Sequence, residues 1–352
     1  MNSRYELAPQ LKIYDNIGIE WVPHLMFTQT TNFRSEIVNT DCYGLRFNKK
    51  PNLNQSIFDE KITSKKSVFI GGSTAFGVGS SSDQKTISSL LSSSSDCHFY
   101  NLGGRAFNGF QELILYQSLI EKLNEIEKIV IFSGLNDLYF FSGIDFDNNF
   151  LGPFFFGKQY FDAMDREHLS PLRTLAKLLL GSLVSHRVNW KSITKGELFK
   201  YILNPHFRKG FNNTNLNPKK NMMLEDILFR NLSLWSTISR GLGVRVYYFL
   251  QPFLGWGKDP SREELEIIKF IDDKTSKFLP HKILNKIQDL DHYYSYQNLL
   301  KTYCDKLKID FFDCNQMLKE NSTKTDWLFV DRAHMNDDGN NLLSTYIREK
   351  IE

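Results

Sequence analysis

Residues 67–74 read SVFIGGST, an apolar run that ends abruptly in two glycines and two hydroxyl side chains. A short apolar run of this kind is typical of a strand that is buried on both faces of a parallel sheet. Glycines allow a tight turn at the carboxyl end of such a strand, where the ligand site of an open parallel sheet lies. This stretch therefore predicts the fold class and also places Ser73 at the candidate site.

Four further runs repeat the pattern, at residues 98–102, 129–132, 244–250 and 309–313. Apolar residues at three- and four-residue steps after or between these runs indicate helices. They are Leu113, Tyr116, Ile120 and Leu123; Leu224, Leu228, Trp235 and Ile238; Leu265, Ile268 and Ile271; Leu299, Tyr303 and Leu307; and Leu343, Ile347 and Ile351. Strands that alternate with helices predict a flavodoxin-like, three-layer α/β/α fold around a parallel five-stranded sheet.

Two segments do not follow this alternation. Residues 1–60 precede the first predicted strand and have a mixed, loop-like composition, so we treat them as an N-terminal extension of a domain at 61–352. Residues 140–220 separate the third and fourth strands and are rich in Phe, Asn and Gly. A connection of this length is uncommon in a compact domain. We expect an insertion that is either a cap over the site or a helical surface decoration.

Composition and charge narrow the function classes. The 352 residues suffice for one large domain or two small ones, and the formal net charge is only +3. Because no basic stripe is interleaved with aromatic residues, we expect no nucleic-acid partner. No apolar stretch approaches the ~18 residues of a membrane-spanning helix, and residues 1–10 do not read as a signal peptide. We therefore expect a cytoplasmic protein without a membrane span.

The four cysteines are not arranged as a metal or redox site. Cys42, Cys97, Cys304 and Cys314 include no C-x-x-C pair, which argues against a zinc site or a redox motif. No metal and no cofactor are therefore expected. The sequence leaves the oligomeric state open.

The residues with catalytic potential fall at predicted strand ends and near the carboxyl terminus. Ser73 and Asn136 follow the first and third strands, and residues 331–334 read DRAH. A serine hydroxyl is a weak nucleophile unless a base takes its proton. Asp331 can accept from Nδ1 of His334 three residues later, which leaves Nε2 free to act on the serine. Separately these residues suit a helix cap, a turn and a helix-start pair, but together they predict a Ser-His-Asp triad.

In these blocks the sequence resembles the SGNH (GDSL-like) hydrolase superfamily. Residues 71–74, GGST, resemble the first block, with Gly72 where an acidic residue is commonest. Residues 134–137, GLND, match the third block, and residues 331–334 match the last block, D-x-x-H. The resemblance spans about residues 65–139 and 244–350, and it implies the SGNH hydrolase fold for the domain at 61–352.

The second block of the family departs from its pattern here. Family members usually have a glycine about five residues after the Asn of this block. Counted from Asn101, that position is occupied by Ala106 in this sequence. The resemblance implies an oxyanion hole made of the Ser73 N–H, the Asn136 side-chain amide, and the N–H of either Ala106 or Gly104. Four further residues near this edge are candidate substrate contacts, with ordinary loop packing as the alternative for each: Arg105, Phe107, Gln251 and Trp256.

The resemblance implies a serine esterase that hydrolyses small O-acyl esters, with O-acetyl groups on carbohydrate as the substrate suggested by analogy. The expected partner is thus a small-molecule or glycan ester. An O-acyltransferase that acts on a glycan with the same triad is the alternative. A non-catalytic glycan-binding protein is a further alternative, which Gly72 and Ala106 favour because they depart from the family pattern.

Overall fold

The computed structural model describes residues 4–50, 53–58, 65–123, 125–142, 155, 224–275 and 279–352. The chain divides into two units, Met1–Phe155 with Met222–Glu352, and Phe156–Asn221. The second unit lies outside the described residues, as does the predicted insertion at 140–220 apart from residues 140–142 and 155. All of the described helices and strands lie in the first unit.

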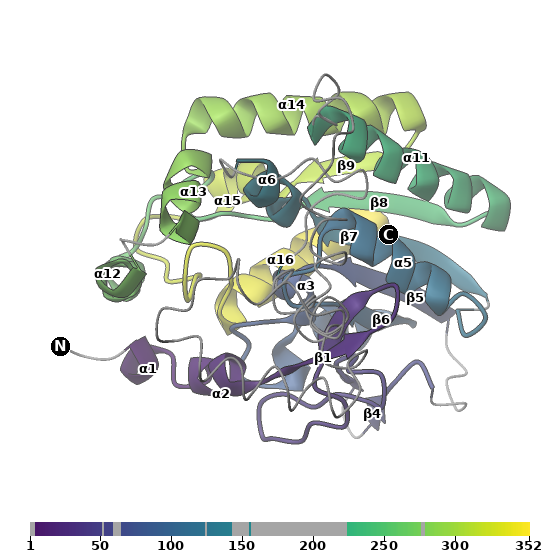
Figure 1. Cartoon of the computed structure of the whole chain (residues 1–352), viewed down its shortest axis with the longest axis horizontal. Helices are drawn as coiled ribbons and strands as arrows, with labels where there is room; N and C mark the ends of the chain where they lie inside the picture. Colours follow the sequence, from purple (N-terminus) through teal and green to yellow (C-terminus); the bar gives the residue numbers. More distant parts are fainter. Residues whose placement is uncertain are drawn as a thin grey trace, which may run out of the picture. The chain divides into compact units, whose positions relative to one another are not determined.

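A five-stranded parallel sheet forms the centre of this unit (Figure 1). Its strands are β5 (Lys65–Gly71), β6 (Cys97–Gly103), β7 (Ile126–Ser133), β8 (Arg245–Leu250) and β9 (Asp310–Asp313). They lie in the order β6-β5-β7-β8-β9, and every neighbouring pair is parallel. The predicted strands and the flavodoxin-like order are confirmed. Because the chain first steps from β5 to β6 and then crosses to β7, the topological switch point lies between β5 and β7.

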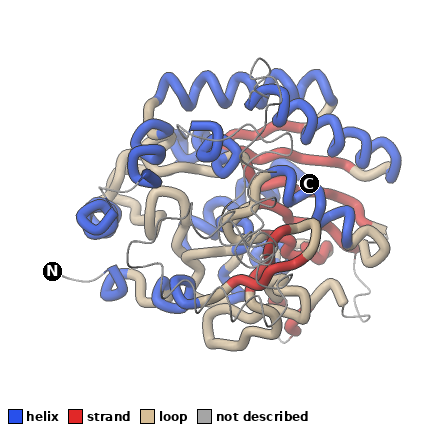
Figure 2. The backbone as a smooth tube through the Cα atoms, viewed as in Figure 1, coloured by secondary structure: helices blue, strands red, loops and turns tan. Residues whose placement is uncertain are grey.

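Helices cover both faces of the sheet, which confirms the three predicted layers (Figure 2). One face packs against α5 (Gly109–Ser118), α6 (Leu135–Ser142), α11 (Leu224–Leu242), α13 (Leu279–Ile287) and α14 (Leu290–Leu307). The other packs against α4 (Ile87–Ser93), α15 (Cys314–Asn321) and α16 (Asp337–Ile351). Neighbouring strand residues alternate between the two cores, as Ile70 and Phe69 do, because successive side chains of a strand point to opposite faces.

The predicted helical faces are correct in α11 and α16 but wrong in two places. α5 ends at Ser118, so Ile120 lies in a turn and is 39% exposed. In α12 (Arg262–Thr275), Leu265 is 54% exposed, whereas Ile267 is buried. Glu264 takes the inward position in the first turn of α12, because Lys258 neutralises its carboxylate there. The spacing of apolar residues does not reveal this position, because it depends on the pairing of Glu264 with Lys258.

The N-terminal segment forms two helices and two antiparallel hairpins. These are α1 (Arg4–Leu7), α2 (Leu11–Asn16), β1 (Ile19–Val22) with β2 (Met26–Gln29), and β3 (Asn48–Lys50) with β4 (Leu53–Gln55). The buried Arg46 attaches this segment to the domain that contains the five-stranded sheet. Its Nε pairs with Asp83 at 2.8 Å, and its Nη1 donates to the Gly77 carbonyl just after the Ser73 turn. The segment thus supports the backbone next to the candidate site.

Replacing Arg46 by alanine is expected to lower the free energy of unfolding by about 3–5 kcal/mol. The change leaves the Asp83 carboxylate buried without its cationic partner, which is the costly way to break a buried ion pair. Urea unfolding measures the loss, with the exposed Arg240→Ala on α11 as the matched control. Equal, small losses in the two variants would contradict this role of Arg46.

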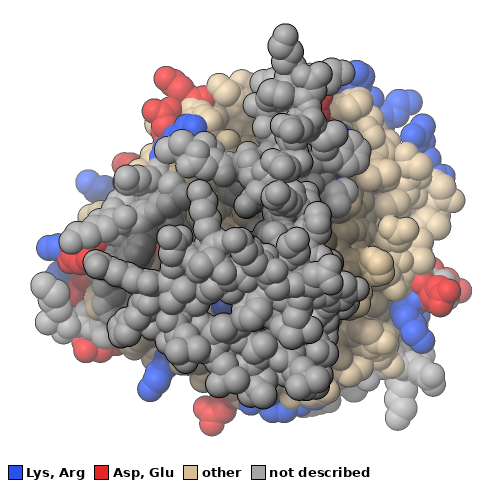
Figure 3. All heavy atoms as spheres, viewed as in Figure 1, with Lys and Arg blue, Asp and Glu red and all other residues tan. Residues whose placement is uncertain are grey.

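Two further features of the structure concern membrane-spanning helices and metal-ion sites. No helix among the described residues is long and apolar enough to cross a bilayer. Within the same ranges, no group of three or more His, Cys, Asp or Glu side chains is arranged to hold a metal ion. On the part of the surface that is coloured in Figure 3, acidic and basic side chains are interspersed around the rim.

Candidate active site

Ser73 opens the short helix α3 (Ser73–Phe76) directly after β5, at the carboxyl edge of the sheet. Gly71, two residues before Ser73, packs closely against the neighbouring strand β7. A Cβ on Gly71 would stand 2.0 Å from the Phe132 carbonyl oxygen in β7, so only glycine fits. This close approach sets Ser73 at the switch point of the sheet, where α/β proteins bind ligands.

A hydrogen-bonded chain links Ser73, His334 and Asp331. Nδ1 of His334 lies 2.6 Å from Oδ2 of Asp331, and Nε2 of His334 lies 2.7 Å from Oγ of Ser73. Because a carboxylate only accepts, Nδ1 carries the ring proton in this arrangement, and Nε2 accepts from the Ser73 hydroxyl. The structure therefore brings Ser73 together with His334, 261 positions later in the sequence, and with its neighbour Asp331.

Asp331 also shapes the loop that carries the histidine. Its Oδ1 accepts the backbone N–H groups of Ala333 and His334, both at 2.8 Å. Burial by itself raises the pKa of Asp331, but the charge of His334 and these hydrogen bonds lower the pKa to about 2. Asp331 is therefore an anion at neutral pH. It orients the imidazole ring and can stabilise a positive charge on it.

A buried ion pair between Glu264 and Lys258 holds the chain just before the loop that carries Asp331 and His334. Oε1 of Glu264 accepts the backbone N–H groups of Leu328 and Phe329 at 2.8 and 2.9 Å. Its Oε2 pairs with Nζ of Lys258 at 2.7 Å, and both side chains are almost wholly buried. Sequence reasoning missed this support for the loop. The only available signal was the S-x-x-E spacing of Ser261 and Glu264, which predicts a helix-capping box and nothing about a distant loop.

The hydrogen bonds of the predicted oxyanion-hole donors distinguish among them. Among the described residues, no hydrogen bond engages the N–H of Ser73 or that of Ala106. The N–H of Gly104 donates to the Gly71 carbonyl at 3.0 Å, so Ala106 is the better of the two predicted alternatives. Nδ2 of Asn136 donates to the Phe107 carbonyl at 2.6 Å, and its second N–H is left for a ligand.

Ala106 adopts a left-handed backbone, with a φ of 63°. This conformation costs a residue with a side chain about 1–2 kcal/mol, and glycine adopts it freely. A glycine, which the resemblance leads one to expect here, would adopt this conformation without that cost. Alanine has the smallest side chain that can take its place, and it keeps the backbone N–H.

Asp137, the neighbour of Asn136, ties α6 to the loop that carries Ala106. Its carboxylate oxygens accept the Gly109 N–H at 3.2 and 3.3 Å. Burial raises the pKa of Asp137 to about 6, against the opposing effects of that hydrogen bond and of Arg230. The neighbouring Glu112 is also buried and accepts from the Ser133 hydroxyl, and burial together with Asp137 raises its pKa well above the usual value.

Asp137→Asn is expected to flatten the pH dependence of stability in mildly acidic solution. Because the folded-state pKa of Asp137 is raised from 3.8 to about 6, the wild type loses stability as the pH rises through this interval. The loss amounts to about 3 kcal/mol, at 1.36 kcal/mol per pKa unit. Urea unfolding of both proteins between pH 4 and pH 7 measures the difference. Parallel curves would show that Asp137 does not titrate with the raised pKa.

The four candidate substrate contacts are all engaged within the protein. Their contacts are Arg105 Nη1 to the Ile17 carbonyl at 2.8 Å, the Phe107 ring edge-on to Phe27 at 5.6 Å, Gln251 Nε2 to Thr74 Oγ1 at 3.2 Å, and Trp256 Nε1 to the Ile287 carbonyl at 2.8 Å. Phe107, Gln251 and Trp256 are also buried. These contacts favour the alternative of ordinary loop packing for each residue.

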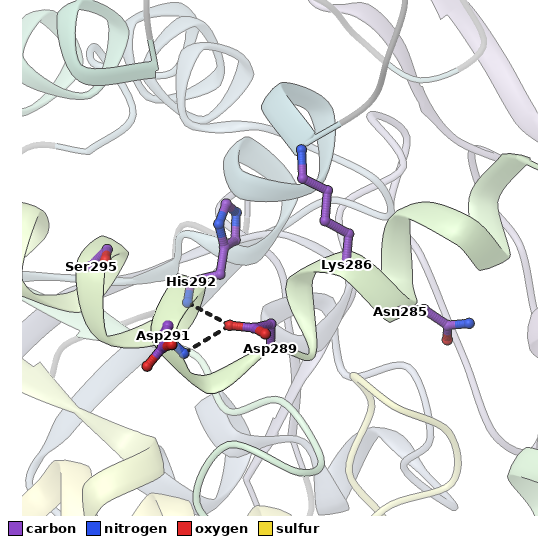
Figure 4. A pocket seen from close by; sticks show the side chains of 6 residues that line it. All are labelled: Asn285, Lys286, Asp289, Asp291, His292 and Ser295. Atoms are coloured by element: carbon purple, nitrogen blue, oxygen red, sulfur yellow. Dashed lines mark hydrogen bonds between the residues drawn. The ribbon is translucent and has the colours of Figure 1, made fainter.

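A separate open pocket of about 510 Å³ lies where α13 meets α14 (Figure 4). It is lined by Asn285, Lys286, Asp289, Asp291, His292 and Ser295, and by none of the predicted site residues. His292 and Lys286 extend to the same side in Figure 4, and both contact Ser142 at the end of α6. Asp289 accepts the first N–H groups of α14. These contacts anchor the ends of the helices around the pocket.

No family model and no curated protein matches this sequence. Several solved structures are similar in fold. An acetyl xylan esterase is 11% identical over 82% of this chain and 100% of its own, with a TM-score of 0.40. The lipase/acylhydrolase from Enterococcus faecalis is 12% identical over 82% and 95%, with a TM-score of 0.41. A GDSL-like lipase from Bacteroides thetaiotaomicron is 13% identical over 82% and 87%, with a TM-score of 0.39. Likeness at this level does not by itself assign a family or an activity.

Proposed function

We propose that this protein is a serine esterase of the SGNH type, which hydrolyses small O-acyl esters such as O-acetyl groups on carbohydrate. The observation that carries the proposal is the unbroken chain of hydrogen bonds from Ser73 through His334 to Asp331, at 2.7 and 2.6 Å. A nucleophile within reach of a base, which a third group orients, is the signature of an activated serine.

The roles follow from the geometry of the three side chains. Ser73 Oγ attacks the ester carbonyl carbon while its proton passes to Nε2 of His334. The carbonyl oxygen becomes an oxyanion, and three N–H donors stabilise it: the backbone N–H groups of Ser73 and Ala106 and the side-chain amide of Asn136. Collapse of this intermediate expels the alcohol, which takes the proton from His334 and leaves an acyl-serine. Water then attacks with His334 as base, releases the acid and restores Ser73.

The same geometry argues against a non-catalytic role. A binding protein that merely kept the pocket has no need for the Ser73 hydroxyl to stay in hydrogen-bond reach of His334. Gly72 and Ala106 favour that alternative from sequence alone, but Ala106 still supplies a backbone N–H that has no partner among the described residues. The departures from the family pattern are thus compatible with catalysis.

Hydrolysis of p-nitrophenyl acetate and p-nitrophenyl butyrate, beside an O-acetylated xylo-oligosaccharide, tests the proposal. The proposal predicts release of the acid, acetate or butyrate, by the wild type and none by His334→Ala. Wild-type protein that is inert on all three substrates would contradict an esterase of small esters. Adding an unacetylated glycan separates hydrolysis from transfer, because an acyltransferase would move acetate to the glycan faster than to water.

A further inference from the structure

We infer that Asp272 is a positioning residue, which holds the loop of Asp331 and His334 in place through Arg332. Arg332 lies within this loop, directly after Asp331 in the sequence. Its Nη1 and Nη2 donate to the two carboxylate oxygens of Asp272 in α12, at 2.7 and 2.8 Å. The inference rests on the proposed function, because it treats His334 as the base and Asp331 as the group that orients it.

The loop is the tip of a narrow hairpin. The Val330 N–H donates to the His334 carbonyl at 2.9 Å and closes the hairpin. Glu264, in the first turn of α12, accepts the backbone N–H groups of residues 328–329, just before this closure. Residues 331–333 extend beyond the closing bond, so their position also depends on contacts that the tip itself makes with the rest of the protein.

Three hydrogen-bonded contacts from described residues outside the hairpin reach this tip. The Leu254 N–H donates to the Arg332 carbonyl at 2.8 Å, and the Thr74 hydroxyl donates to the Ala333 carbonyl at 3.1 Å. The third contact is the pair of Arg332 with Asp272, in which both partners are charged. Bidentate hydrogen bonds between charged groups are about twice as strong as neutral ones, so this pair is the strongest of the three contacts.

The burial of Arg332 makes its partner important. Its side chain is only 10% exposed, and Asp272 is the one acceptor that its guanidinium engages among the residues that the structure describes. A guanidinium stays charged, so without the Asp272 carboxylate it must move toward water or another acceptor. Because Arg332 is bonded directly to Asp331, such a movement displaces the carboxylate that orients His334.

Asp272→Asn is therefore expected to slow turnover. The variant keeps the shape of the side chain but places an NH₂ group where one oxygen accepted from the guanidinium. We expect kcat to fall by ~10–10²-fold, since a displacement of about 1 Å caused far from the reacting atoms can cost ~10²-fold. KM should change little, because the orientation of His334 affects proton transfer in the transition state more than binding of the ester.

The next residue of the same helix provides the matched control. Asp273 is exposed, and Asp273→Asn removes the same charge from α12. This control should keep full turnover, and thermal unfolding of both variants checks that each is folded. An Asp272→Asn protein with the kcat of Asp273→Asn would overturn the inference while leaving the proposed esterase intact.

A double-mutant cycle with Arg332→Met tests whether Asp272 acts through Arg332. If it does, Asp272→Asn costs nothing further once the guanidinium is gone, because the two residues form one pair. The expected result is a double variant as active as Arg332→Met. Losses that multiply would show that Asp272 affects turnover by another route, and would overturn the inference.

A readout that is independent of turnover separates the inference from the proposed function. In protein labelled with ¹⁵N-histidine, the ring-nitrogen signals of His334 are identified by their loss in His334→Ala, and Ser73→Ala gives the Nε2 signal without the serine hydrogen bond. We expect Asp272→Asn to move the Nε2 signal toward that position and Asp273→Asn to leave it in place. An unmoved signal in Asp272→Asn would overturn the inference, whatever the activity. If the wild type hydrolyses no ester but the signal moves, the esterase proposal fails, whereas the positioning of His334 by Asp272 stands.

Discussion

Ser73→Ala is expected to lower kcat for ester hydrolysis by at least ~10⁴-fold, because the variant has no nucleophile at the end of the hydrogen-bonded chain. The remaining rate reflects the oxyanion donors and substrate binding. The free energy of unfolding should change by about 1 kcal/mol or less, since only one side-chain hydrogen bond is lost. Stopped assays with p-nitrophenyl acetate, together with urea unfolding, measure both quantities.

The matched control for Ser73→Ala is Ser118→Ala at the exposed end of α5. This variant also loses one serine hydrogen bond, to the Ile114 carbonyl, and should keep full turnover. A Ser73→Ala protein with wild-type turnover would show that Ser73 is not the nucleophile. A large loss of stability with intact turnover would instead assign Ser73 a structural role at the start of α3.

Asp331→Asn is expected to lower kcat by ~10⁴-fold with a much smaller change in KM. The asparagine can keep its carbonyl oxygen on the Ala333 and His334 N–H groups, which then turns its NH₂ group toward Nδ1 of His334. Nδ1 must accept from that group, so the ring proton moves to Nε2. A protonated Nε2 cannot take the proton of Ser73, although the geometry of the site is preserved.

Measurement of kcat and KM for Asp331→Asn tests this tautomer argument against simple loss of charge. The matched control is Asp305→Asn on the exposed surface of α14, which also removes one negative charge. This control should leave both kcat and KM unchanged. A fall in kcat of tenfold or less for Asp331→Asn would mean that Asp331 does not set the tautomer of His334.

The sequence was sufficient to predict the sheet and the contacts among Ser73, His334 and Asp331. Short apolar runs that end in small residues mark buried strands, and parallel strands bring their carboxyl ends to one edge. The spacing of Asp331 and His334 predicts their contact, because a three-residue turn allows little else. These features depend on local pattern and on one rule of topology.

Features that depend on distant partners were not predictable from the sequence. The choice between Gly104 and Ala106 is decided by a hydrogen bond from Gly104 to Gly71, a residue on another strand. The inward position of Glu264 depends on Lys258 and on a loop more than 60 residues away. The N-terminal segment reads as loop, because its short hairpins are too brief to show periodicity, and Arg46 reads as a surface charge until Asp83 is placed beside it.

Covalent labelling of the nucleophile is the most direct test of whether His334 activates Ser73. The wild type is treated with a fluorophosphonate, which reacts with activated serines, and the site of added mass is located by peptide mapping. We expect one phosphonate on the peptide that contains Ser73, and none on the same peptide in His334→Ala. Modification of a different serine, or equal labelling of Ser73 in both proteins, would contradict activation of Ser73 by His334.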